Sequence, residues 1–323
     1  MKLSEQYSEI KAELELFDQR LIERLSEAEE PVKTATTALI QAGGKRSRPL
    51  LCMIASNFGD GEALQLVDVC IALELVHMSS LIHDDIIDQA PLRRGDRTIH
   101  HKYTNQVATY IGDYLVAEAL EIMSEIADQK AHQLFSSTLK YLALGELAQY
   151  KNRYQMNPSL IAYFRKNRNK TARLIALSCQ LGAITTNAIS SIQKQLYLFG
   201  YYLGMSYQII DDILDFTSTA DDLGKASGQD LRSGYLTLPT LLAIQDKQIF
   251  HELELIFNRH QLIKEFDFDP IVADIKNTDA IQRSYQYSQW YLNQAIKQIK
   301  RLPDKKEKDL LYQLVGYLSK RPH

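Results

Sequence analysis

The amino-acid sequence predicts one all-α domain built from many long helices, and three observations support this prediction. Only 8 prolines and 14 glycines occur in 323 residues, and the prolines lie far apart. Between them, apolar residues recur at steps of three and four, as in EALQLVDVCIALELVHMSSLIHDD. A sustained alternation of apolar and polar residues, which a half-buried strand requires, is missing from the sequence. We therefore treat residues 1–323 as a single domain.

The ends of these helices are expected at turn-forming residues. We predict breaks at Gly43-Gly44, Asn57–Gly61, Ala90-Pro91, Asn157-Pro158, Gly224–Gly234, Phe266–Pro270 and Pro303. The middle helices are apolar nearly all round and should be central. The least charged window, Leu174–Gln193, is rich in Ser, Thr, Asn and Gln, so we interpret it as a buried helix and not as a membrane span.

Charge and cysteine content narrow the functional classes. The chain has 37 basic and 40 acidic residues, so no overall field favours nucleic acid or an acidic membrane. Cys52, Cys70 and Cys179 lie in apolar runs and are expected to be buried thiols of a reducing compartment. The N-terminus is acidic and amphipathic without an apolar signal region, so we expect a cytoplasmic protein.

Two aspartate clusters of the pattern DDxxD are the most informative motifs. They occupy Asp84–Asp88 and Asp211–Asp215, and both are flanked by apolar runs. The first and last aspartates of each cluster lie one helical turn apart and share a face. Carboxylates beside a core are costly without counter-charge, and Mg²⁺ takes a few carboxylates before filling its shell with water and phosphate oxygens. We expect the two clusters to face each other across a cavity and to bind Mg²⁺ through Asp84, Asp85, Asp88, Asp211, Asp212 and Asp215.

Basic residues that would bind the phosphates follow in four places. They occur in GGKRSRP, in PLRRGDRTIH directly after the first cluster, in RKNRNKTAR, and in DLGKASGQDL after the second cluster. Arginine binds phosphate oxygens in a bidentate manner, whereas lysine acts as a point charge. The repeated placement of basic turns beside acidic helix ends predicts a diphosphate site.

The ordered series of motifs resembles the all-trans (E-type) polyprenyl diphosphate synthases. The series runs GGKRSRP, LVHMSSLIHDDIID, RRGDRTIH, GDYLVAEAL, GELAQ, KTARL, YQIIDDILD and GKASGQDL, with a basic tail YLSKRPH. The resemblance is nearest to medium- and long-chain members such as the catalytic component of bacterial heptaprenyl diphosphate synthase. It implies an isoprenoid-synthase bundle of long antiparallel helices around a central cavity, and a homodimer that works with or without a small second subunit.

The resemblance also implies roles for individual residues. Isopentenyl diphosphate would be held by Lys45, Arg48, His77 and Arg94, and the allylic diphosphate by Arg93, Lys170 and Lys225. Mg²⁺ would be bound by Asp84, Asp88 and Asp211, with Asp215 assisting through water. Thr171 and Gln208 would direct oxygen dipoles toward the developing allylic cation. The family often has proline where Arg97 stands and lysine where Tyr235 stands, so we assign no phosphate role to Tyr235.

These roles describe one reaction. The C–O bond of the allylic diphosphate would break, the double bond of isopentenyl diphosphate would attack the cation, and loss of a proton would give a chain one isoprene unit longer. Mg²⁺ and the cationic side chains would stabilise the charge on the leaving diphosphate. No nucleophilic side chain is required, and the released diphosphate is the candidate base.

Product length is expected to depend on Ser79 and Ser80, about one turn, or ~5.4 Å, before Asp84. In short-chain members of the family, bulky aromatic residues here act as a floor. Two serines leave the path open, so we expect a product of about C30 to C50, suited to a quinone side chain.

Four alternatives compete with this interpretation. A plain helical scaffold is disfavoured, because a scaffold does not need paired arginines beside paired acidic clusters. A class I terpene cyclase shares DDxxD, but its second metal motif usually has an Asn/Asp–Ser/Thr–Glu pattern. A non-catalytic partner subunit would typically lose site aspartates or arginines, and both clusters are complete here. Glu74-x-x-His77 resembles half a di-iron site, which needs a second such motif that the sequence lacks. We therefore predict a prenyltransferase.

Overall fold

The computed structural model describes residues 11–156, 159–218, 227–259 and 266–319 of the chain. Regular structure in these residues is helical except for a hairpin of two short strands, β1 (Leu92–Arg93) and β2 (Asp96–Arg97). The prediction of an all-α protein is confirmed. The chain divides into two compact units, which are described separately; that the whole chain is one domain stays a prediction.

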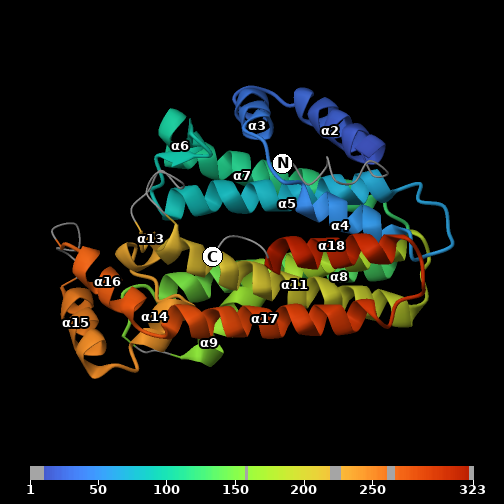
Figure 1. Ribbon diagram of the computed structural model, residues 1–323. Helices are drawn as coiled ribbons and strands as arrows, with labels where there is room; N and C mark the ends of the chain where they lie inside the picture. The colour runs from blue at the N-terminus through green and yellow to red at the C-terminus, as the bar shows by residue number, and fades with distance from the viewer. Residues whose placement is uncertain (1–10, 157–158, 219–226, 260–265, 320–323) are drawn as a thin grey trace. The chain divides into compact units, whose positions relative to one another are not determined.

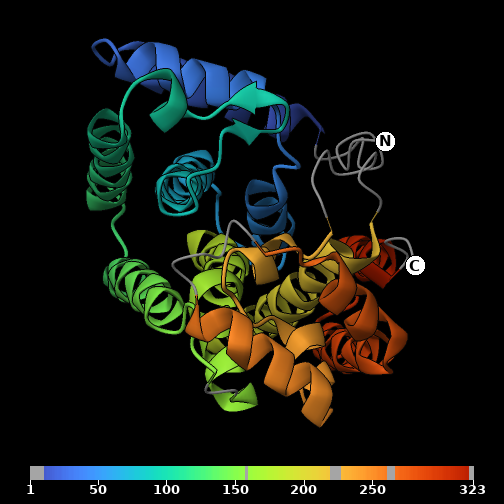
Figure 2. The ribbon, with the colours of Figure 1, turned by 90° about the vertical axis from the view of Figure 1, so that its left-hand side faces the viewer.

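Unit 1 contains the described residues up to Phe135, together with Leu177–Tyr197 and Leu302–Leu310. Its central helix is α5, which packs against α4 and α7 (Figures 1 and 2). The helices and strands that lie entirely in this unit are α2 (Lys11–Ser26), α3 (Val32–Gln41), α4 (Ser47–Ser56), α5 (Leu66–Ile87), β1, β2, α6 (Ile99–Lys102) and α7 (Asn105–Ser124).

Helix α5 is long and apolar enough to cross a membrane by composition alone. In the structure, however, 67% of its most apolar window is buried inside the protein, and its neighbours are helices. Burial all round explains why the apolar residues do not form a single stripe. The helix is therefore a core helix of unit 1 and not a membrane span.

Unit 2 contains residues 136–176 and 198–301 and the described residues from Leu311 onward. In it, α14 packs against α9, α16 and α17 (Figure 1). The elements that lie entirely in this unit are α9 (Leu160–Asn167), the π-helical turn η1 (Arg168–Ala172), α13 (Gln229–Arg232), α14 (Leu238–Ala243), α15 (Lys247–Asn258), α16 (Asp269–Asn277) and α17 (Ala280–Ile299). Four further helices contribute residues to both units: α8 (Gln129–Lys151), α10 (Arg173–Thr185), α11 (Ser190–Thr217) and α18 (Glu307–Ser319).

Several helices begin at side chains that accept a hydrogen bond from the first turn. Thr104 caps α7 by accepting from the Val107 N–H at 3.1 Å, and Ser159 caps α9. Asp246 caps α15 in the same manner. Short polar side chains at these positions satisfy backbone donors that have no partner inside the helix.

Predicted breaks at Gly43-Gly44, Asn57–Gly61, Ala90-Pro91 and Pro303 all fall between helices. Asn157-Pro158 and part of Gly224–Gly234 lie outside the described residues, but the described remainder of the latter holds α13, a helical turn that we did not expect. The predicted break Phe266–Pro270 extends too far, because helix α16 already begins at Asp269 and its first turn includes Pro270.

The window Leu174–Gln193 is buried over most of its length but is not one helix, and this prediction was wrong. Helix α10 ends at Thr185 and α11 begins at Ser190. The Thr186 hydroxyl donates to the Ser56 carbonyl at 2.7 Å, so a tertiary hydrogen bond holds the turn. Neither proline nor glycine marks this break, which is why the sequence did not reveal it.

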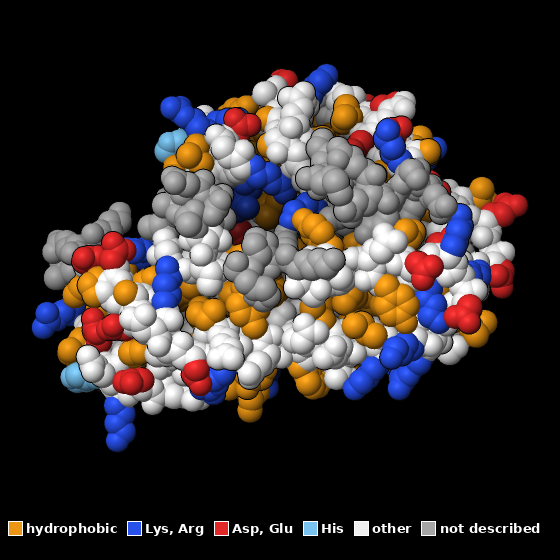
Figure 3. Space-filling model, in the orientation of Figure 1, with side chains coloured by type: hydrophobic (Ala, Val, Ile, Leu, Met, Phe, Trp, Pro, Cys, Tyr) orange, Lys and Arg blue, Asp and Glu red, His pale blue; other side chains and the backbone are white. Residues whose placement is uncertain are grey.

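The burial of the cysteines and the distribution of surface charge agree with the sequence predictions. Cys52, Cys70 and Cys179 are all buried free thiols, as predicted. Acidic and basic side chains are interspersed over the face drawn in Figure 3. This agrees with a net charge of only −3.

Candidate active site

The first aspartate cluster lies at the C-terminal end of α5. Asp84 and Asp85 belong to its last turn, and Asp88 is the C-cap residue, whose N–H donates to the Asp84 carbonyl at 2.8 Å. A helix C-terminus carries partial negative charge, so three carboxylates here are unfavourable unless cations lie close by. The surroundings of this cluster supply such cations.

Arg93, which follows the cluster on β1, binds Asp85 directly. Its Nη2 lies 2.6 Å from Asp85 Oδ1, and its Nε lies 2.8 Å and 2.9 Å from the two carboxylate oxygens. Burial opposes the charged form of Arg93, but the hydrogen bond and charge of Asp85 raise its pKa. The sequence assigned Asp85 to metal and Arg93 to the allylic diphosphate; the structure joins the two residues, and both assigned roles stay predictions.

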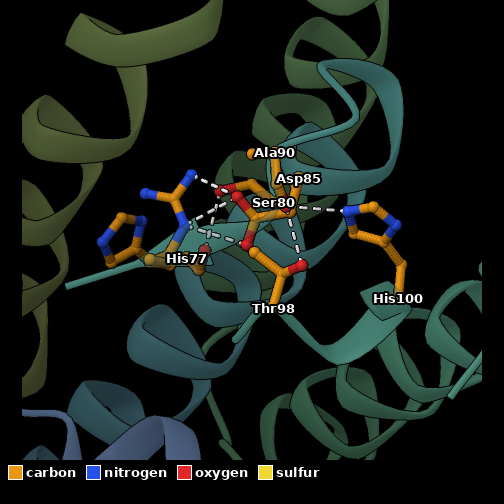
Figure 4. Close-up of polar contacts among 7 residues, drawn as sticks. His77, Ser80, Asp85, Ala90, Thr98 and His100 are labelled. Carbon is orange, nitrogen blue, oxygen red and sulfur yellow. Dashed lines mark hydrogen bonds and ion pairs between the residues drawn. The ribbon is translucent and has the colours of Figure 1, made fainter. Parts of the chain in front are cut away.

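The loop that carries Arg93 is fixed to the end of α5. The Thr98 hydroxyl donates to the Ala90 carbonyl at 2.7 Å, and His100 Nε2 lies 2.9 Å from the same oxygen (Figure 4). Arg94 has a φ of +53°, in the left-handed region that costs a non-glycine residue free energy. The RRGDRTIH motif thus places two consecutive arginines on a fixed hairpin.

His77 lies in a strongly cationic environment in unit 1. Burial lowers its pKa well below the usual value, and the charges of Arg48, Arg94, Arg93 and Arg46 lower it further. The imidazole is therefore neutral, and the neighbouring guanidinium groups are the donors that would attract an anion here. Three of the four residues predicted to hold isopentenyl diphosphate, His77, Arg48 and Arg94, are therefore brought together.

Gly44, which precedes Arg46 and Arg48 in the chain, has a steric reason to be glycine. A Cβ on Gly44 would lie 3.2 Å from Arg94 Nη1 and 3.3 Å from Arg46 Nη1, so the bare backbone lets both guanidinium groups approach. Lys45, next in the chain, is exposed. The fourth predicted ligand thus lies beside the same backbone.

Arg46 has a different role from its neighbours. Its Nε lies 2.8 Å from Asp18 Oδ1, and its Nη1 lies 3.3 Å from Glu74 Oε1, a carboxylate that is only 5% exposed. The predicted family roles did not include this ion pair. Its only sequence signal was the buried glutamate in the apolar run that ends at the first cluster.

Ser79 is buried and Ser80 half-buried on α5, one turn before Asp84. The Ser80 hydroxyl donates to the His77 carbonyl at 2.7 Å, which keeps that side chain against its own helix (Figure 4). Neither serine is bulky, in agreement with the premise of the chain-length prediction.

The second aspartate cluster lies in α11, in unit 2. Burial and the charge of Asp212 raise the pKa of Asp211 to about 8. Asp212 is 2% exposed and accepts from the Tyr163 hydroxyl at 2.5 Å and from Gln208 Nε2 at 2.9 Å. Burial raises its pKa, opposed by Lys166 and by these hydrogen bonds.

Asp215 completes the second cluster and accepts hydrogen bonds at the start of α13. Its carboxylate accepts from the N–H groups of Gln229 and Asp230 at 3.0 Å and 3.1 Å, at the start of α13. Burial raises the pKa of Asp215 in spite of these hydrogen bonds. Direct coordination of a metal by Asp215 would compete with these two hydrogen bonds, which agrees with the water-mediated role expected for Asp215.

Lys170 and Thr171 lie on η1, beside α8. Lys170 Nζ lies 2.9 Å from Glu146 Oε2. A Cβ on Gly145 would lie 3.0 Å from the Lys170 backbone nitrogen, so glycine allows α8 to approach this turn. Single π-helical turns occur frequently at functional sites. In the GELAQ motif, Gly145 thus allows the close approach of α8, and Glu146 forms the ion pair with Lys170.

Thr171 and Gln208 meet in the structure, as their predicted common role requires. The Thr171 hydroxyl donates to Gln208 Oε1 at 2.7 Å. Of the remaining predicted residues, Lys225 lies outside the described residues. Tyr235, to which we assigned no phosphate role, is 8% exposed, with the Arg153 guanidinium 5.6 Å from its ring centre.

The arrangement of the aspartates is compatible with a divalent cation that is bound together with a substrate. In the part of the chain that the structure describes, no three His, Cys, Asp or Glu side chains gather closely enough to form a ready-made metal site. Mg²⁺ does not need one, because it keeps several waters and binds one or two carboxylates together with substrate phosphates. Asp211 is half-buried, and desolvation together with the Asp212 charge raises its pKa, so a bound cation would stabilise its charged form.

Comparison with known proteins agrees with this assembly of residues. A model of the family described as polyprenyl synthetase matches residues 29–267. A heptaprenyl diphosphate synthase component 2 of Bacillus subtilis (strain 168) is 42% identical over 321 residues, covering 99% of this chain and 91% of that protein.

Solved structures give the same result. A heptaprenyl diphosphate synthase from Staphylococcus aureus matches with a TM-score of 0.91 and 35% identity, over 97% of this chain and 99% of that chain. A polyprenyl synthase from Caulobacter crescentus CB15, complexed with calcium and isoprenyl diphosphate, matches with a TM-score of 0.91 and 26% identity, over 100% and 98% of the two chains. The predicted class of enzyme is thereby confirmed: the chain belongs to the polyprenyl synthetase family.

Proposed function

We propose that this chain is a Mg²⁺-dependent prenyltransferase that condenses isopentenyl diphosphate with an allylic diphosphate in trans. The allylic primer would be farnesyl or geranylgeranyl diphosphate, and the product a polyprenyl diphosphate of about C30 to C50, a length supported by the small side chains of Ser79 and Ser80 one turn before Asp84. The observation that carries the proposal is in unit 2. Asp211, whose pKa is raised by desolvation and by the Asp212 charge, lies on the same helix as Gln208, and the Gln208 amide oxygen accepts a hydrogen bond from Thr171.

The residues divide the work. Lys45, Arg48, His77 and Arg94 would bind the diphosphate of isopentenyl diphosphate. Arg93, Lys170 and Lys225 would bind that of the allylic substrate. Mg²⁺, when bound by the aspartates of both clusters, would neutralise charge on the leaving diphosphate. Asp84, Asp88 and Asp211 would hold it, and Asp85, Asp212 and Asp215 would support them.

The chemistry at carbon would rely on oxygen dipoles. As the allylic C–O bond breaks, positive charge develops on the chain, and the oxygens of Thr171 and Gln208 would stabilise it. The electron pair of the isopentenyl double bond then forms the new C–C bond, and the released diphosphate would take the proton. Exclusion of water from the cation is a further requirement, since water would give an alcohol.

The quaternary and cellular assignments are part of the same proposal. The Bacillus subtilis relative is called component 2, which supports the alternative that this chain elongates only together with a small partner subunit. A homodimer is the proposed assembly of the chain itself. Three buried free thiols suit a reducing cytoplasm. A quinone side chain is the proposed use of the product.

The experiment is an elongation assay with the purified chain alone, farnesyl diphosphate, labelled isopentenyl diphosphate and Mg²⁺, with EDTA as the control. We expect a metal-dependent series of products that ends near one length. Cyclic hydrocarbons would instead indicate a terpene cyclase. A folded chain that binds the diphosphates with Mg²⁺ but does not elongate would indicate that the partner subunit is required, and one that binds neither would contradict the proposal.

A further inference from the structure

Four side chains of unit 2 form a continuous hydrogen-bonded chain. The Thr171 hydroxyl donates to Gln208 Oε1 at 2.7 Å, Gln208 Nε2 donates to Asp212 Oδ1 at 2.9 Å, and the Tyr163 hydroxyl donates to Asp212 Oδ2 at 2.5 Å. The four residues come from α9, η1 and α11. Only Tyr163 has no role in the motif analysis.

The direction of these hydrogen bonds is fixed because the Asp212 carboxylate can only accept them. An ionised Asp212 offers oxygens alone, so Gln208 must turn its NH₂ group toward Asp212 and its carbonyl oxygen toward Thr171. The Thr171 hydroxyl hydrogen is then used by Gln208. The lone pairs of Thr171 Oγ remain for positive charge elsewhere.

Burial makes this arrangement rigid. Asp212 is 2% exposed and Tyr163 is 4% exposed, so water cannot replace a lost partner at low cost. The Leu238 backbone N–H and the nearby charge of Lys166 add to the support of the carboxylate. The oxygens of Asp212 are therefore occupied by protein donors.

We infer that Tyr163 is a positioning residue, which holds Asp212 so that Asp212 fixes the Gln208 amide and, through it, the Thr171 hydroxyl. This inference rests on the proposed function, in which the oxygens of Gln208 and Thr171 face the allylic cation. Asp212 then acts on the reaction through Gln208, and Asp211 is the residue of this pair that holds metal. The DDxxD pattern alone does not reveal that Asp211 and Asp212 have these different roles.

The test is the variant Tyr163→Phe, which removes one hydroxyl and keeps the ring. Since dipole orientation matters chiefly when the cation forms, kcat should fall about tenfold while KM for both substrates changes less than about twofold. Mg²⁺-dependent binding of inorganic pyrophosphate, measured by calorimetry, should stay unchanged. Tyr287→Phe is the matched control, because its ring packs on Phe164 beside Tyr163 and its kcat should equal that of the wild type.

A double-mutant cycle separates positioning from a general loss of structure. In a Gln208→Met background, Tyr163→Phe should lower kcat no further, because its effect passes through Gln208. Additive losses, an unchanged kcat for Tyr163→Phe, or a rise confined to KM would each overturn the inference. Wild-type elongation is measured in the same assay, so failure of the proposed function appears as absent wild-type turnover, and failure of this inference as a wild-type kcat in the variant.

Discussion

The two aspartate clusters share one sequence pattern but differ in what balances their charge. In unit 1, Arg93 binds Asp85 directly, and three more arginines surround His77 on the same helix. In unit 2, burial and the neighbouring Asp212 charge raise the pKa of Asp211 to about 8. The first cluster is thus compensated by the protein itself, whereas the second, in the described residues, favours a proton or an added cation. We therefore expect the charge of the second cluster to depend on an added cation more than the charge of the first cluster does.

The largest expected effect is the loss of one metal-binding carboxylate from either cluster. Asp84→Ala and Asp211→Ala should each lower kcat on the order of 10³-fold, because each removes charge stabilisation at the leaving diphosphate. Radiolabel incorporation measures the rate, and circular dichroism checks the fold. A near-normal rate in either variant would remove that cluster from the metal assignment.

The next effect concerns the internal charge compensation of unit 1. Glu74→Gln should lower the free energy of unfolding by about 3 kcal/mol, because it leaves a buried guanidinium without one of its carboxylates. The control is Glu15→Gln, whose exposed pair with Lys11 should contribute less than about 0.5 kcal/mol. Urea unfolding measures both, and equal values for the two variants would show that the buried pair carries no special stability.

The next effect concerns substrate affinity: a variant in each unit should weaken the binding of a different substrate. Arg94→Ala in unit 1 should raise KM for isopentenyl diphosphate about tenfold or more, since a charge-assisted contact to phosphate is lost. Lys170→Ala in unit 2 should raise KM for the allylic diphosphate instead. Initial rates with each substrate varied in turn test this division, and the reverse pattern would exchange the two predicted sites.

A smaller effect is expected in the pH dependence of the metal-free protein. The folded pKa of Asp211 lies above its unfolded value, so the folded state binds the proton more tightly. The free energy of unfolding should therefore fall as pH rises from about 4 to about 8, and Asp211→Asn should reduce this slope. Mg²⁺ with pyrophosphate should raise Tm more at about pH 8.5 than at about pH 6, because the metal requires the deprotonated carboxylate. Thermal scans across this range check the sign, and a slope identical in Asp211→Asn would contradict it.

The smallest effect on rate, though not on product, is expected at Ser79. Ser79→Phe should shorten the products with only a modest change in initial rate, because it alters the path of the growing chain and leaves the aspartates intact. Chromatography of the dephosphorylated products measures their length. Unchanged lengths would exclude this residue as part of the floor, and Ser80→Ala serves as a size-conserving control.

Much of the architecture could be predicted from local patterns. The apolar run of α5, the glycine and proline breaks and the helical spacing of Gln208, Asp211 and Asp215 are properties of short stretches. Tertiary contacts could not be predicted in this way. The pairing of Arg93 with Asp85 depends on a hairpin, and that of Tyr163 with Asp212 joins residues 49 positions apart.

The remaining differences also have physical reasons. The break after Thr185 is held by a distant carbonyl and not by a local turn residue. The π-helical turn that carries Lys170 and Thr171 has an ordinary helical composition, so nothing in its sequence announces the change of hydrogen bonding. Such irregularities at functional residues are where local consistency is expected to fail.

The most direct test of the account is calorimetric binding of a non-reactive allylic diphosphate analogue, with and without Mg²⁺, to the wild type and to Asp84→Asn and Asp211→Asn. The account predicts binding to the wild type that requires Mg²⁺ and is strongly weakened in both variants. It also predicts that the metal-free folded protein is more stable at alkaline pH in Asp211→Asn than in the wild type. Equal binding in EDTA, or full binding by both variants, would contradict the claim that the two aspartate clusters hold the metal for the diphosphate.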